Sequence, residues 1–380
     1  MILCEFGPGG GPVLFDRAEA VISATAAEDM PGALAMLDAA RARGRWIAGW
    51  VGYEAGYALE PKLAALMPGG REAPLLVMGV FAGPEDAAPV LERAARTAGD
   101  ARMAAPEPMI ARADYDAALA RVLDYLAAGD CYQINLTFPL ASRLVSGTPL
   151  GLYGRLRHAG AVGHGAYADL GVGPVVVSRS PELFFRVDAG GRISARPMKG
   201  TAPRDPDPVR DMELAAELEA SEKNRAENLM IVDLLRNDMS RLSEVGSVRV
   251  PELFRIEHYA TVHQMTSLIE ARLSGRRGFG DLLTALFPCG SITGAPKIRA
   301  MEIIRELEPH PRGIYCGAIG WMAPDGTADF SVAIRTLSVF PGGRIAMNVG
   351  GGVVMDSTAE GEWEEALWKA RFVKAAVSRG

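Results

Sequence analysis

The sequence predicts an α+β fold in which large mixed sheets are flanked by helices. Apolar segments of strand-like composition recur along the chain, and amphipathic helical segments lie between and after them. The two kinds of segment follow no strict strand–helix–strand period, which indicates mixed sheets covered by helices. The chain has 380 residues, of which 49% are hydrophobic and 23% charged, a composition typical of a globular protein with a large core.

The expected strands are short apolar or alternating runs bounded by glycine, proline or polar residues. In chain order they are 46–51, 75–81, 131–138, 175–178, 183–187, 314–321, 328–339 and 345–349. The expected helices carry apolar residues at helical spacing. They are 30–43, 90–97, 114–129 with Asp114 as N-cap, 209–242 with a break at 221–224, 282–287, 297–306 and 358–377.

The domain organisation is predicted from one change in composition. The interval 83–108 is rich in alanine, proline and charged residues, which suits a surface connection. We therefore expect a single globular unit over 1–380, in which an N-terminal subdomain, 1–108, contributes to the sheets and 109–380 forms the core.

Charge and cysteine content argue against several functional classes. The formal net charge is -6 and no long run of lysine and arginine occurs, so nucleic acid is not the expected partner. No window approaches eighteen apolar residues without a charge, and the first residues lack the layout of a secretion signal. We expect no membrane segment and a cytoplasmic protein. The widely spaced cysteines are expected to be reduced thiols and not zinc ligands: Cys4, Cys131, Cys289 and Cys316.

Lys199 is the first candidate for chemistry. It lies between Pro197 and Pro203 and directly before Gly200, so the backbone can hold its side chain in a fixed direction. A lysine amine attacks as a nucleophile only when neutral, which requires burial or a nearby positive charge. The alternative is a lysine in a solvent-exposed loop.

Three glutamates are candidates for a magnesium site. Glu227 shares a helix face with apolar residues, which is unusual for a solvated carboxylate. Glu362 and Glu365 lie one turn apart on the last helix, and carboxylate oxygens at this spacing suit Mg²⁺, with Glu227 completing the set. The alternatives are an ordinary Lys223–Glu227 helix pair and a solvated face that includes Lys369.

Two glycine-rich segments could bind an anion, although neither is a nucleotide motif. Residues 290–297 have the wrong spacing for a P-loop, and 350–352 lack the third glycine of the dinucleotide fingerprint. Both could present backbone amides to a carboxylate, the first beside a helix that Pro296 is suited to begin. The alternative is tight-turn chemistry without a ligand.

Two polar residues lie within strand-like runs. Arg335 interrupts an apolar segment, where a buried guanidinium needs an anionic partner. That partner is either a substrate carboxylate or an internal Asp or Glu. Gln133 lies in an alternating run and could face a pocket, or it could lie on an exposed edge strand.

Several of these segments, taken together, resemble the chorismate-utilising enzymes. The segments are 180–182, 197–201, 225–230, 290–297, 334–336 and 350–352, and the match runs in order from about 114 to 369. Within that family the sequence is most similar to the aminodeoxychorismate synthase component I branch, the sister of anthranilate synthase component I. The resemblance implies two large sheets packed face to face in a four-layer α/β/β/α arrangement, with chorismate and magnesium in a cleft.

The resemblance also implies roles for individual residues. The implied metal ligands are Glu227, Glu362 and Glu365. The implied surroundings of the substrate are Arg335, Thr293, Lys297, Thr201, Gln133, Gly350, Gly351 and Gly352. The implied catalytic residues are Glu182, as the acid that protonates the departing C4 hydroxyl, and Lys199, as the nucleophile at ring C2.

Lys199 decides which branch the resemblance favours, because anthranilate synthases usually have alanine at this place. The expected activity is the magnesium-dependent conversion of chorismate and ammonia to 4-amino-4-deoxychorismate for para-aminobenzoate and folate biosynthesis, with ammonia supplied by a glutaminase (component II) partner. The alternatives are an anthranilate synthase and a silent subunit that only activates a glutaminase. One departure is that Gln264 stands where the family has histidine, with His263 one position earlier on the opposite face of a strand.

Overall fold

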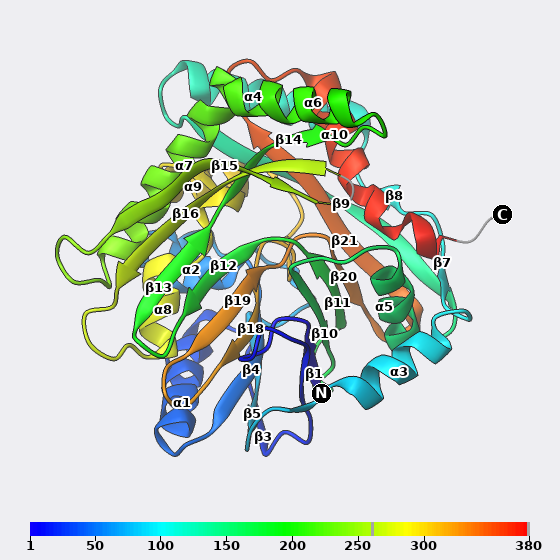
Figure 1. The fold of residues 1–380 in the computed structure, drawn as a ribbon, viewed down its shortest axis with the longest axis vertical. Coiled ribbons are helices and arrows are strands. Elements are labelled where there is room, and N and C mark those ends of the chain that lie inside the picture. Colours follow the sequence, from blue (N-terminus) through cyan, green and yellow to red (C-terminus); the bar gives the residue numbers. More distant parts are fainter. Residues whose placement is uncertain (260–261, 378–380) are drawn as a thin grey trace.

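The chain forms two large antiparallel sheets packed face to face, with helices on both outer sides (Figure 1). This computed structural model describes residues 1–259 and 262–377. The α+β, four-layer prediction is confirmed. Of the mixed or antiparallel sheets that were expected, the structure has antiparallel ones, since each pair of named strands runs antiparallel.

The first sheet has eleven strands, among them β1 and β21, the first and the last strand of the described chain. Its longest strands, β9 and β21, pair over ten consecutive positions from Arg344↔Arg143 to Val353↔Ile134. The strand order is β17 (Gly294–Ala295), β9 (Gln133–Ser146), β21 (Arg344–Val353), β20 (Thr336–Val339), β11 (Val175–Ser180), β10 (His164–Ala168), β1 (Ile2–Cys4), β2 (Val13–Phe15) and β6 (Glu85–Asp86), with β7 (Arg102–Met103) and β8 (Glu107–Pro108) also on β9.

The second sheet has ten strands. Its order is β14 (Met198–Pro203), β16 (Val262–Arg272), β13 (Arg192–Arg196), β12 (Leu183–Val187), β19 (Ala328–Val332), β18 (Ala318–Met322), β4 (Trp46–Val51), β5 (Leu76–Phe81) and β3 (Ala20–Ala24), with β15 (Arg249–His258) also on β16. Strands from the first hundred residues occur in both sheets. The subdomain boundary near residue 108 remains a prediction.

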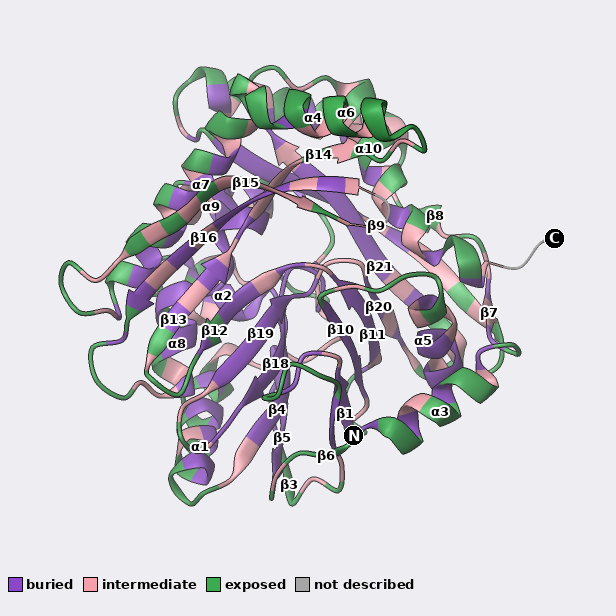
Figure 2. Cartoon of the chain, in the orientation of Figure 1, coloured by how far each residue is buried: buried purple, intermediate pink, exposed green. Residues whose placement is uncertain are grey.

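Three apolar clusters hold the layers together. The cluster between the sheets joins Phe15 and Val176 of the first sheet to Trp50 and Ile319 of the second. A second cluster lies under the helices that cover the ten-stranded sheet, namely α1 (Met30–Ala42), α2 (Ala55–Leu59), α7 (Glu222–Ser240) and α8 (Phe279–Leu286). A third lies under those that cover the eleven-stranded sheet, namely α3 (Ala88–Thr97), α4 (Arg112–Ala127), α5 (Pro149–His158), α9 (Lys297–Leu307) and α10 (Ala359–Lys369). Figure 2 shows the strands buried and the outer helix faces exposed.

The tandem helices predicted over 209–242 are confirmed. They are α6 (Pro208–Ala220) and α7, and Ser221 ends the first and caps the second by accepting a hydrogen bond from the Asn224 amide. Short 3₁₀ helices occur at η1 (Ala27–Asp29), η2 (Pro61–Leu66), η3 (Gly290–Ile292), η4 (Pro341–Gly343) and η5 (Ala370–Ala376). In the described residues, no helix combines the length and the apolar character needed to cross a membrane.

Several local predictions are wrong in their detail. Asp114 is not the N-cap of α4, because the helix begins at Arg112 and Asp114 lies in its first turn. The stretch around Lys199 is strand β14 and not a loop, and the glycine triplet is the end of strand β21 and not a turn. The strand predicted over 328–339 is two strands, β19 and β20, which belong to different sheets. The chain crosses between the sheets at Arg335.

Candidate active site

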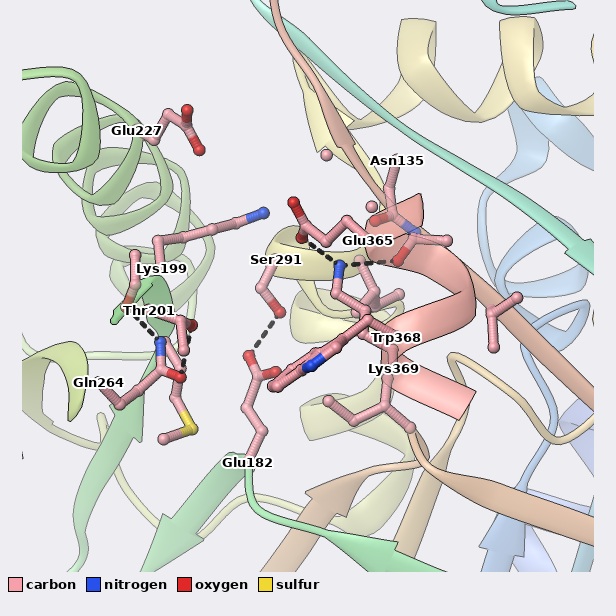
Figure 3. A pocket seen from close by; sticks show the side chains of 18 of the residues that line it. Asn135, Glu182, Lys199, Thr201, Glu227, Gln264, Ser291, Glu365, Trp368 and Lys369 are labelled. Carbon is pink, nitrogen blue, oxygen red and sulfur yellow. Dashed lines mark hydrogen bonds and ion pairs between the residues drawn. The ribbon is translucent and has the colours of Figure 1, made fainter. Parts of the chain in front are cut away.

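A cavity of about 750 Å³ lies where the two sheets meet. Strand β14 and helix α7 form one side of it, and strand β21 and helix α10 form the other. Figure 3 shows Lys199 and Glu227 on the first side, with Glu365 and Lys369 facing them. Segments far apart in the sequence therefore converge on one cavity, as the resemblance implied for a substrate cleft.

Lys199 projects from β14 into this cavity (Figure 3). Burial lowers the pKa of its amine below the ordinary value, and Glu227 opposes that shift while Lys369 adds to it. The residue after it, Gly200, has a φ of 89°, and a Cβ there would lie 3.0 Å from the Cβ of Asn224. Glycine thus lets the strand turn against α7 while the lysine remains directed inward.

Thr201 and Gln264 are polar residues that line the cavity beside Lys199. The Thr201 hydroxyl donates to Gln264 Oε1 at 3.0 Å, and Gln264 Nε2 donates to the Gly200 carbonyl at 2.7 Å. Gln264 lines the cavity, whereas His263 points away and contacts Asp211 at 2.9 Å through Nε2. The expectation that adjacent residues of this strand face opposite sides is confirmed.

Glu182 is a buried carboxyl in the cavity wall. Burial raises its pKa, and a hydrogen bond of 2.6 Å from the Ser291 hydroxyl partly opposes that rise. A carboxyl with a raised pKa can remain protonated and act as a general acid. Ser291 belongs to the glycine-rich segment, but no spacing or motif in the sequence pairs it with Glu182.

Arg335 lies at the crossing between β19 and β20 with a φ of 50°. A left-handed conformation costs a non-glycine residue about 1–2 kcal/mol. The bend places the side chain in the cavity wall, where burial lowers the pKa of the guanidinium and Glu182 opposes that effect. Within residues 1–259 and 262–377 the guanidinium has no ion pair, so the internal-partner alternative is not observed.

The Gly290–Lys297 segment contributes less to the cavity than the sequence predicted. Ser291 and Ile292 line the cavity, but Thr293 is buried with its hydroxyl donating to the Cys289 and Gly290 carbonyls. Lys297 donates to Asp238 at 2.6 Å and to the Leu286 carbonyl at 2.9 Å. The structure therefore does not bring the side chains of Thr293 and Lys297 into the cavity, because local partners hold them elsewhere.

The three glycines of β21 line the opposite wall. A Cβ on Gly351 would lie 2.9 Å from Glu362 Oε2, and one on Gly352 would lie 2.8 Å from Lys199 Nζ. The Gly350 carbonyl accepts from Lys369 at 2.9 Å and so points away from β9. Because the amide and carbonyl of a strand residue point the same way, the Gly350 amide faces that side too.

The three predicted metal ligands line the same cavity. Burial raises the pKa values of Glu227 and Glu362, and the neighbouring carboxylates add to both shifts. Burial also acts to raise the pKa of Glu365, but Lys369 at 2.7 Å outweighs it and lowers that pKa. In the described parts of the chain no three acidic, cysteine or histidine side chains already surround one point. The oxygen donors fit magnesium in kind, and a cation would relieve their repulsion.

Gln133 is fully buried on β9, between β17 and β21, so it is not an edge-strand residue in water. Further residues that line the cavity were not predicted from the sequence. These are Asn135, Asn348, Ser357, Trp368 and Lys369. Asn135 could have been found from the sequence, because it lies two positions after Gln133 and strand residues two apart share a face.

Comparisons with known proteins agree with this architecture. Residues 5–375 match the family described as chorismate binding enzyme, so the chain belongs to that family. The chain is 45% identical over 262 residues to aminodeoxychorismate synthase component 1 of Escherichia coli and 43% identical over 270 residues to anthranilate synthase component 1 of Streptomyces coelicolor. These alignments cover 69% and 71% of this chain but only 57% and 52% of the two relatives.

A solved structure extends the likeness to the whole described fold. Anthranilate synthase component I from Streptococcus pneumoniae superposes with a TM-score of 0.78 at 26% identity, covering 95% of this chain and 91% of that one. Relatives with two different names are thus similar to this chain to about the same degree. Residues of the cavity have to distinguish the two activities.

Proposed function

We propose that this protein is an aminodeoxychorismate synthase that converts chorismate and ammonia to 4-amino-4-deoxychorismate. The observation that carries the proposal is the position of Lys199, whose amine projects into the cavity of about 750 Å³ and has a lowered pKa. A lysine that loses its proton readily is available as a nucleophile. The resemblance associates a lysine at this place with the amination of chorismate at C4 and alanine with anthranilate formation.

In the proposed reaction Lys199 Nζ forms a bond to ring C2, both ring double bonds shift by one position (C1=C2 to C1=C6 and C5=C6 to C4=C5), and the C4–O bond breaks. Glu182 gives its proton to the departing hydroxyl, which leaves as water. Ammonia then bonds to C4, both double bonds shift back to their original positions, and the C2–N bond to Lys199 breaks. The excess proton on the new amine returns to Glu182, so the sum is chorismate plus ammonia giving the 4-amino product plus water.

The remaining cavity residues hold the substrate in this proposal. Arg335 binds a substrate carboxylate through paired hydrogen bonds, since its guanidinium has no acidic partner in the described residues. Glu227, Glu362 and Glu365 would hold Mg²⁺, which when bound would neutralise the ring carboxylate. Thr201 and Gln264 position Lys199 through the backbone of Gly200.

Ammonia has to come from outside this chain. Cys4, Cys131, Cys289 and Cys316 are all buried, and burial raises the pKa of each thiol, so none is suited to attack glutamine. We therefore propose a separate glutaminase, component II, as the physiological source. Free ammonium at high concentration should replace it in a test.

The deciding experiment is mass spectrometry of the product formed from chorismate, ammonium and magnesium. We expect 4-amino-4-deoxychorismate, with the enolpyruvyl group retained. Anthranilate and pyruvate would instead assign the chain to the second candidate function, which the 43% identity to an anthranilate synthase component favours. No turnover of chorismate under these conditions would support the silent-subunit alternative.

A further inference from the structure

Strand β9 carries a row of buried polar side chains on one face. Gln133, Asn135 and Thr137 alternate with apolar residues, and their exposed fractions are 0%, 5% and 5%. Within the described chain, four of their polar atoms have no hydrogen-bond partner: Gln133 Oε1 and Nε2, Asn135 Nδ2 and Thr137 Oγ1. We call these three residues the β9 polar row.

An apolar side chain at each of these positions would stabilise the folded protein more than the polar one does. A buried polar group without a partner costs about 1–3 kcal/mol, and most buried polar groups in native proteins are satisfied. Residues two apart on a strand are separated by about 7 Å, so the row spans about 14 Å. A row of such groups is explained if small polar molecules bind to them in turn.

One end of the row lies at the proposed nucleophile. A Cβ on Gly352 would lie 2.8 Å from both Gln133 Nε2 and Lys199 Nζ, so these two nitrogens flank a common point. Asn135, the next member, lines the large cavity from the side of β21 (Figure 3). A molecule that leaves the row at this end therefore arrives beside Lys199.

The other end lies at a second cavity of about 350 Å³ between β9, α4 and the segment after α9. Thr137 and Asn348 line it, and Asn348 also lines the large cavity, so the two cavities share a wall. The buried hydroxyl of Tyr115 in its wall has no partner among the described residues. Exposed residues at its rim include the carboxylates of Asp114 and Glu306, of which Glu306 lies 3.7 Å from Arg121 and Asp114 has no ion pair among the described residues.

We propose that the second cavity and the β9 polar row form the access route by which ammonia reaches the reacting ring carbon. This inference rests on the proposed function, because it assumes that ammonia is a substrate. The Asp114 carboxylate at the rim attracts ammonium, which gives its proton to water there, since burying the cation is more costly than burying neutral ammonia. Ammonia can both donate to and accept from the side chains of the row. Chorismate, a dianion, is repelled at the same rim.

The test compares two alanines of α4 in the intact protein. Ala118 lines the second cavity, whereas Ala117 is exposed. We expect Ala118→Phe to raise the KM for ammonium about tenfold, while the KM for chorismate changes less than about twofold, because only one substrate uses the route. Ala117→Phe is the matched control and should leave both unchanged. An unaltered KM for ammonium in a folded Ala118→Phe protein overturns the proposal.

A second, conservative variant tests the proposal even if the Ala118→Phe protein does not fold. Thr137→Val keeps the shape of the side chain and removes only its hydroxyl, so it should raise the KM for ammonium about threefold and preserve the melting temperature. An unchanged KM for ammonium in this variant argues against the row. The KM for ammonium can be measured whether the product is 4-amino-4-deoxychorismate or anthranilate. Failure of the proposed function is therefore recognised separately from failure of the access route.

A measurement without turnover completes the test. A high-resolution crystal structure should show ordered small molecules hydrogen-bonded to Thr137 Oγ1, Asn135 Nδ2 and the Gln133 amide. If the row is dry and closed between the two cavities, the route does not exist, whatever the enzyme makes. If the row is filled but Ala118→Phe and Thr137→Val leave the ammonium KM unchanged, its molecules are structural water and the proposal is also wrong.

Discussion

The two walls of the large cavity differ in how their charges are satisfied. On the β21–α10 wall, Lys369 bridges Glu365 and the Gly350 carbonyl, and the Ser357 hydroxyl donates to Glu362 at 2.6 Å. On the β14–α7 wall, the side chains of Lys199 and Glu227 form no hydrogen bond or ion pair with the described residues. We call these the paired wall and the unpaired wall.

This difference indicates which wall is complete before a ligand arrives. Lys199 and Glu227 are both half-buried, and a partly buried charge without a partner is unfavourable, so folding alone gives no reason to keep them. Each wall comes from a different sheet, and the two approach only in the folded chain. The paired wall is therefore suited to hold the substrate in place, and the unpaired wall to react with it or to bind its counterion.

Replacing Lys199 should have the largest effect on activity. Lys199→Ala removes the proposed nucleophile and should slow formation of the 4-amino product by about 100-fold or more. It should not lower the melting temperature, because the lost amine was half-buried without a partner. The rate is measured by quenched turnover, and intact-protein mass spectrometry of wild type during turnover should show the substrate adduct.

The matched control on the other wall is Lys369→Ala. It leaves Glu365 and the Gly350 carbonyl unpaired, so it should lower stability by up to about 1 kcal/mol. If Lys199→Ala retains the wild-type rate, covalent catalysis is wrong. If both lysine variants change stability alike, the two walls are not different in the way described.

Glu227→Gln should nearly abolish magnesium-dependent activity while preserving the fold. The neutral amide is a poor ligand for Mg²⁺, and it removes a carboxylate whose pKa is raised by burial and by Glu362 and Glu365. The melting temperature without metal should stay the same or rise, and magnesium should no longer shift it. Full activity of this variant, or of wild type in a chelator, would exclude the carboxylates as a metal site.

Arg335→Lys should have an intermediate effect, directed at chorismate. Lysine keeps the charge but loses the planar pair of donors, which is worth about 1.5–3 kcal/mol in a charge-assisted contact. The specificity constant for chorismate should fall about 10- to 100-fold, and the KM for ammonium should not change. Unchanged kinetics would mean that the guanidinium does not contact the substrate.

The sequence predicted the fold class and most of the elements because their signals are local. Apolar spacing located α7 and Ser221 marked its start, and glycine and proline bounded β4 at the observed residues. It failed where a distant partner decides the outcome. The conformation of Arg335 depends on the crossing between sheets, and the place of Lys297 depends on Asp238, a carboxylate 59 residues away.

The candidate site was predicted only in part, because some of its contacts also depend on partners far away in the sequence. Lys199 and Glu227 were candidates from their positions in the sequence, Glu182 was found by resemblance, and the cavity brings the three together. Neither spacing nor motif pairs Ser291 with Glu182, or Lys369 with the Gly350 carbonyl, since both contacts arise from tertiary packing. The β9 polar row was visible as alternation, but the lack of partners is a property of the folded chain only.

The smallest effect is expected at Ser291, and it tests how the departing hydroxyl is supplied with a proton. The Ser291 hydroxyl stabilises the ionised form of Glu182 and so acts against the burial that raises its pKa. Ser291→Ala removes that opposition, and the pKa should rise further. A general acid must be protonated, so activity is lost as pH rises through this pKa. The alkaline limb of the pH–rate profile should therefore move to higher pH, with kcat below the limb falling less than about tenfold.

Ser357→Ala is the control for that shift. It removes an equivalent hydroxyl from Glu362 on the paired wall, where no proton transfer is proposed. This variant should weaken magnesium binding or leave it unchanged, but it should not move the alkaline limb. If Ser291→Ala also leaves the limb in place, Glu182 is not the acid that protonates the departing hydroxyl, and the proton must come from another group in the cavity wall.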